Sequence, residues 1–92
     1  KPYFPAAMFY YENNLDLKKA AAWMDAAVAA SPSPQMWMIY RQGLIRAKLG
    51  DKAGALAAAQ RSLDLVKSDA KSPASLKEEY TRLNNALIAS LK

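Results

Sequence analysis

The sequence holds 92 residues, of which 52% are hydrophobic and 23% charged, with a net charge of +5 at neutral pH. This balance excludes an intrinsically disordered chain, which would be less apolar, and the length is that of one small domain. The sequence contains neither cysteine nor histidine, which excludes disulfides, thiolate metal sites and catalysis by the commonest general base.

Turn-forming residues divide the sequence into five stretches that we expect to be helical. Within each stretch apolar residues recur at three- and four-residue spacing, which is the period of an α-helix, and no stretch keeps the strict alternation of a strand. Because the connections are short, neighbouring helices are expected to lie antiparallel. The predicted fold is all-α, with five antiparallel helices at roughly 5–13, 16–30, 34–49, 52–68 and 74–91.

Aspartate and glycine mark two of the helix boundaries. Asp16 follows two asparagines and is expected to cap the second helix, because a carboxylate accepts hydrogen bonds from free N–H groups at a helix start. Gly50 is the residue type that ends helices in a left-handed conformation. Asp51 follows it at once, so the third helix is expected to end and the fourth to begin at this pair.

Serine and proline mark the starts of the third and fifth helices. Ser33-Pro34 and Ser72-Pro73 each predict a serine N-cap followed by proline at the first helical position. Ser75-x-x-Glu78 has the spacing of a capping box and is an alternative start for the fifth helix.

An offset of 35 residues relates the first two helices to the third and fourth. It carries Ala20, Met24 and Ala27 onto Ala55, Ala59 and Ser62, and Phe4, Met8 and Tyr11 onto Ile39, Gly43 and Arg46. Small residues on the second helix of each pair would allow close approach to the first helix.

A period of 33–35 residues built from two antiparallel helices resembles the tetratricopeptide repeat. The first unit keeps Phe4, Tyr11, Ala20, Ala27 and Pro32 of that family's pattern, and the second keeps Gly43, Gly50-Asp51, Ala55 and Leu63. The second unit departs from the pattern at Gln42, Arg46, Ala59 and Lys67. The last helix resembles the first half of a repeat through Tyr80, Leu83, Asn84 and Leu87. The resemblance implies a single tetratricopeptide-like domain over 1–92, made of two helix-turn-helix repeats and a C-terminal capping helix.

A narrower resemblance concerns the segments "YYENNLDLKKAAAWMDAAV" and "AKLGDKAGALAAAQRSLDL". They are similar to the C-terminal helical region of a bacterial family described only as a domain of unknown function, whose members carry an export signal and an N-terminal β-rich domain. This resemblance implies a fragment of a longer chain, located in the bacterial periplasm or secreted. Without it the expected location is the cytoplasm.

Catalysis, metal binding and cofactor binding find no support in the sequence. The serines and the threonine have no histidine partner, and each serine has an explanation as a cap or helix-surface residue. The carboxylates are scattered, and the adjacent pair Glu78-Glu79 would point about 100° apart on a helix. We therefore expect no enzyme, no catalytic residue, no metal site and no cofactor. No membrane partner is expected either, because the longest uncharged run, 26–40, is interrupted by prolines.

Binding of a protein or peptide is the predicted function, with the partner either a separate protein, an N-terminal domain of the same polypeptide or a second copy. In tetratricopeptide domains the first helix of each pair lines a concave surface. The resemblance implies that this surface holds Phe9, Trp37, Tyr40, Leu44, Lys48 and Asn85. Family members that grip a C-terminal carboxylate have lysine, asparagine and arginine where this sequence has Pro5, Phe9 and Leu44, so that clamp is missing.

Two alternatives remain open from the sequence. The apolar run "MWMIY" at 36–40 either forms part of the domain's own core or contributes to a binding surface, with Trp37 then expected to be more exposed than Trp23. The second alternative is a basic helical module that binds nucleic acid, through Arg41, Lys48 and Lys52 with Tyr40 close by.

Overall fold

The computed structural model describes residues 2–92, and this part of the chain is all-helical without a strand. The five α-helices are α1 (Tyr3–Glu12), α2 (Leu17–Ala30), α3 (Met36–Leu49), α4 (Lys52–Ser68) and α5 (Ala74–Ser90). The predicted fold class is therefore confirmed, with helix boundaries within two residues of those expected.

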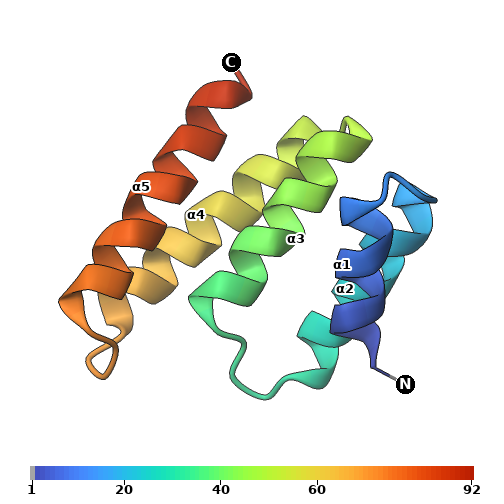
Figure 1. The fold of residues 1–92 in the computed structure, drawn as a ribbon. Helices are drawn as coiled ribbons and strands as arrows, with labels where there is room; N and C mark the ends of the chain where they lie inside the picture. The colour runs from blue at the N-terminus through green and yellow to red at the C-terminus, as the bar shows by residue number, and fades with distance from the viewer. Residues whose placement is uncertain (1) are drawn as a thin grey trace.

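Each helix runs back alongside the one before it, so that the chain forms a succession of antiparallel hairpins (Figure 1). Besides these sequential contacts, α3 packs against α5. The Cα trace measures 35 × 33 × 19 Å, and the short dimension fits two layers of helices whose axes lie about 8–10 Å apart. The helix α3 thus has neighbours on several sides, namely α2, α4 and α5.

The aspartate and glycine boundaries have the predicted structure. The Asp16 carboxylate accepts a hydrogen bond from the Lys19 N–H at 3.1 Å, and the Asp51 carboxylate accepts one from the Gly54 N–H at 2.9 Å. Gly50 has a φ of 94°, in the left-handed region that favours glycine. The backbone of Gly50 thus ends α3, and the carboxylates of Asp16 and Asp51 cap the starts of α2 and α4.

The predicted serine caps are wrong. The N-cap of α3 is Gln35, so both Ser33 and Pro34 lie outside the helix, and neither Gln35 nor Pro73 makes a side-chain capping bond. Ser72 does not cap α5 because its hydroxyl donates to the carboxylate of Asp69 instead. The capping box at Ser75 is also wrong, since α5 begins at Ala74 with Pro73 as its N-cap.

The core follows the 35-residue offset on α2 and α4. The six corresponding positions are all buried: Ala20, Met24, Ala27, Ala55, Ala59 and Ser62. One apolar cluster joins α1 and α2 to Ile45 of α3, and a second joins Met36 of α3 to Val66 and Tyr80. Small side chains at the helix contacts therefore let the two layers approach closely.

Two buried polar side chains connect α3, α4 and α5. The Ser62 hydroxyl donates to the Met36 carbonyl at 2.8 Å, and the Asn84 amide donates to the Ser62 hydroxyl and to the Tyr80 carbonyl, each at 2.8 Å. The Asn84 oxygen Oδ1 has no hydrogen-bond partner among residues 2–92. The network thus fixes α5 against the start of α3 while leaving one acceptor unused.

Candidate protein-binding face

The side of α3 that its neighbouring helices bury only in part holds a row of aromatic, aliphatic and basic side chains. We call this row the α3 stripe; it consists of Trp37, Tyr40, Arg41, Leu44 and Lys48. Their three- and four-residue spacing confines them to about 100° of the helix circumference. The remaining sides of α3 are used for packing: a side chain at Gly43 would contact α4 and α5, and Ile45 is buried with α1 and α2.

Helix α1 contacts one flank of the α3 stripe. The ring of Phe4 meets Trp37 edge to face, with centroids 5.2 Å apart. At the other end of the stripe, the Lys48 ammonium lies 4.7 Å from the centre of the Tyr11 ring and donates to the Tyr11 carbonyl at 3.3 Å. These contacts orient the first and last residues of the stripe.

Helix α5 contacts the α3 stripe through Tyr80. Its ring meets Tyr40 edge to face, with centroids 5.7 Å apart, and its hydroxyl accepts a hydrogen bond from Nη1 of Arg41 at 3.0 Å. The same Nη1 donates to the Trp37 carbonyl at 3.2 Å, one turn earlier on α3. The guanidinium is thereby held in place over the helix that carries it.

The residues of the α3 stripe are neither fully buried nor freely exposed. Trp37, Tyr40, Arg41 and Leu44 are half-buried, and Lys48 is exposed. Burial raises the pKa of the Tyr40 hydroxyl; nearby Tyr11 and Tyr80 raise it further, while Arg41 and Arg82 act in the opposite direction. The stripe therefore combines apolar surface that water reaches with fixed positive charge.

The structure brings together four of the six residues predicted for the binding surface, namely Trp37, Tyr40, Leu44 and Lys48. It does not place the other two on the α3 stripe. Phe9 is 58% exposed and lies two residues, or about 160° around α1, from the fully buried Ala7. Asn85 is exposed about 140° around α5 from Tyr80, the residue that contacts the stripe.

Both tryptophans are half-buried, so the expected contrast in exposure between Trp37 and Trp23 stays a prediction. Trp23 meets Tyr10 edge to face at 4.8 Å, much as Trp37 meets Phe4. Arg41 is a residue of the stripe that the predicted surface omitted. Its position four residues after Trp37 is the signal that could have identified it.

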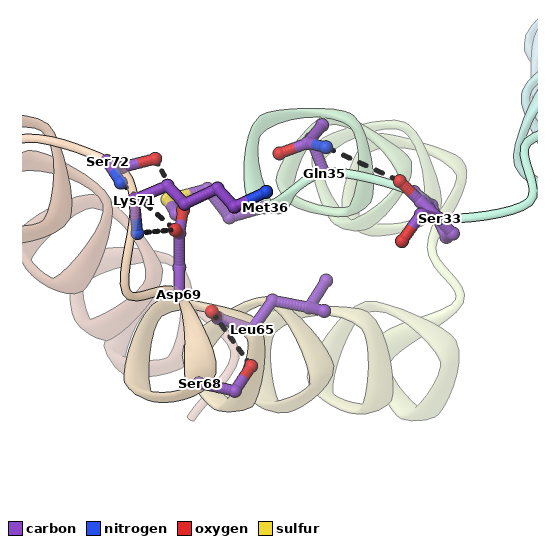
Figure 2. A pocket seen from close by; sticks show the side chains of 9 residues that line it. Ser33, Gln35, Met36, Leu65, Ser68, Asp69, Lys71 and Ser72 are labelled. Atoms are coloured by element: carbon purple, nitrogen blue, oxygen red, sulfur yellow. Dashed lines mark hydrogen bonds between the residues drawn. The ribbon is translucent and has the colours of Figure 1, made fainter.

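A pocket of about 290 Å³ lies between the α2–α3 and α4–α5 connections (Figure 2). It is lined by Ser33, Pro34, Gln35, Met36, Leu65, Ser68, Asp69, Lys71 and Ser72. The Asp69 carboxylate accepts hydrogen bonds from the Ser72 hydroxyl and from the N–H groups of Lys71 and Ser72, at 2.8 and 3.0 Å, and these bonds lower its pKa. Asp69 is thus occupied by its own turn, and we assign no ligand to this pocket.

The described part of the chain holds neither a metal-binding cluster nor a membrane-spanning helix. No group of three or more acidic side chains lies close enough together to hold a metal ion. No helix within residues 2–92 is long and apolar enough to cross a membrane. In comparisons with known proteins, no family model, no curated protein and no solved structure matches this chain.

Proposed function

We propose that this chain is a non-catalytic interaction module of the tetratricopeptide type, which binds a segment of a protein through the α3 stripe. The partner is a separate protein or another part of the same polypeptide. The observation that carries the proposal is that Trp37 and Tyr40 are only partly buried, each oriented by an edge contact with an aromatic ring of a neighbouring helix.

Oriented aromatic side chains suit this role for an energetic reason. Tryptophan, tyrosine and arginine are the residues most enriched at interface hot spots, because they supply large contact areas. A side chain that is already held in one conformation loses little further entropy when a partner binds. The α3 stripe offers all three residue types within two helical turns.

The experiment is a selection from a random peptide library displayed on phage, followed by affinity measurement for the recovered peptides. Trp37→Ala is expected to weaken binding by about 30-fold, which corresponds to a hot-spot contribution of about 2 kcal/mol. Trp23→Ala is the matched control, because Trp23 is also half-buried against one aromatic ring but lies on α2. The proposal fails if no peptide is recovered, or if recovered peptides bind the Trp37→Ala protein as tightly as the wild type.

A further inference from the structure

From the charges on the α3 stripe we infer that the segment it binds is acidic, and that two side-chain carboxylates of this segment pair with Arg41 and Lys48. This inference rests on the proposed function and adds the chemistry of the partner. It concerns carboxylates inside a peptide rather than a carboxylate at its end.

The two basic side chains of the stripe contact neutral groups. Arg41 donates to a carbonyl and a tyrosine hydroxyl, and Lys48 donates to a carbonyl and lies over a tyrosine ring. The ion pairs found within residues 2–92 both belong to Arg46, which binds Asp25 and Asp51 away from the stripe. No ion pair within the described residues therefore neutralises the positive charge of the stripe.

The guanidinium of Arg41 is arranged to accept a carboxylate. Both of its hydrogen bonds use Nη1, which leaves Nε and Nη2 available on the adjacent edge. That edge carries two parallel N–H donors, the geometry that binds a carboxylate in bidentate fashion. Because Nη1 is already held, the group needs little further ordering to bind.

The spacing of the two cations limits the form of the partner. Arg41 and Lys48 are seven residues apart, so their Cα atoms are separated by about 10.5 Å along α3. In a polyproline-type segment, residues three apart lie on one side and about 9 Å from each other. Acidic residues three apart would therefore reach both cations, whereas the two residues between them would point to other sides of the segment.

The test uses a library of acetylated, amidated eight-residue peptides, so that no terminal carboxylate contributes. Each sequence is made in four forms. The first has two glutamates three positions apart and the second has two glutamates side by side. The third and fourth carry two glutamines or two lysines at the positions of the spaced glutamates. The spaced glutamate form is expected to bind at least tenfold more tightly than the glutamine form, with affinity decreasing as salt is raised. The lysine form is expected not to bind.

Substitutions assign the effect to the two cations. Arg41→Gln is expected to remove most of the preference for glutamate, and Lys48→Gln part of it. Arg41→Lys keeps the charge but lacks the forked donors, so it should bind more weakly than the wild type while retaining salt dependence. Lys67→Gln, at an exposed position on α4, is the control for net charge. Circular dichroism melts check that each variant is folded.

The outcomes separate this inference from the proposed function. Peptides that bind in a Trp37-dependent manner without preferring glutamate would overturn the inference and leave the proposed function standing. If no peptide binds in a Trp37-dependent manner, both the inference and the proposed function are wrong. If a single-stranded oligonucleotide binds with a steep salt dependence that Arg41→Gln and Lys48→Gln reduce, the stripe binds phosphate and the peptide inference is wrong.

Discussion

Helix α3 lies close to both α4 and α5 at Gly43, and this contact gives a quantitative test of the packing. A methyl group placed on Gly43 would lie 3.0 Å from Cδ2 of Leu87, 3.4 Å from Cβ of Ala58 and 3.5 Å from the carbonyl oxygen of Ala55. For Gly43→Ala, a gain in helix propensity of about 1 kcal/mol opposes crowding of a flexible leucine methyl. We expect the alanine variant to stay within about 1 kcal/mol of the wild type.

The leucine variant at the same position should behave differently. Gly43→Leu adds three more carbons to a space bounded by two helices, one of them through its backbone. Overpacking of this kind costs about 1–3 kcal/mol, and we expect a net loss of about 2 kcal/mol in the free energy of unfolding. In a domain of this size that loss lowers Tm by about 10 °C in a circular dichroism melt. Ala57→Leu, on the exposed side of α4, is the control and should change Tm little.

One result would refute the packing described for α3. If Gly43→Leu melts at the wild-type temperature, the leucine side chain has room at this position. The contact of α3 with α4 and α5 would then be looser than the distances to Leu87 and Ala58 indicate.

Three further predictions address the helix contacts, a cap and a turn. Ala27→Leu should lower the free energy of unfolding by about 1–3 kcal/mol, whereas the exposed Ala30→Leu should change it little; equal shifts in thermal melts would contradict the packing of α2. Asp16→Ala should cost about 1 kcal/mol in urea unfolding through loss of the cap, and Asp16→Asn much less, because asparagine also caps helices. The folded-state pKa of Asp69 lies below the usual 3.8, so the turn is favoured above that pH and weakens as pH falls through the lowered pKa. In an NMR titration Ser72→Ala should raise the Asp69 midpoint, since the Ser72 hydroxyl is the largest cause of the shift; an unchanged midpoint would exclude that bond.

Boundaries set by local chemistry were readable from the sequence. The caps at Asp16 and Asp51 depend on a carboxylate and on N–H groups three residues later, so a few neighbouring residues contain all the information. The same holds for Gly50, whose left-handed φ is accessible to glycine without strain.

Helix boundaries could not be predicted in this way where two local interactions compete for the same side chain. Ser72 is equally suited to capping a helix and to closing a turn with Asp69, and it does the second. Ser33 precedes proline in the same manner, yet α3 starts three residues later, at Met36. The sequence pattern also did not predict on which side of their helices Phe9 and Asn85 lie. The repeat resemblance implies the order of the helices, but it does not determine how each helix is rotated about its axis.

The buried polar network shows a different limit. Asn84 lies four residues after Tyr80 and three before Leu87, and all three are buried on one side of α5. The distant partner of Asn84, Ser62, lies 22 residues away in the chain, and Ser62 in turn donates to the carbonyl of Met36, 26 residues before it, so no local signal identifies these bonds. A polar residue on a core stripe indicates that a partner exists but not which residue it is.

The question of whether residues 36–40 form core or surface has an answer that differs for each residue. Met36 and Ile39 are buried, at 2% and 0% exposure, and Met38 packs against the cluster of α1 and α2. Trp37 and Tyr40 stay half-buried on the α3 stripe. A helix that contacts one cluster on one side and a second cluster on another needs apolar residues around most of its circumference. The continuous apolar run therefore follows from the central place of α3, and only the two aromatic residues are left for the proposed partner.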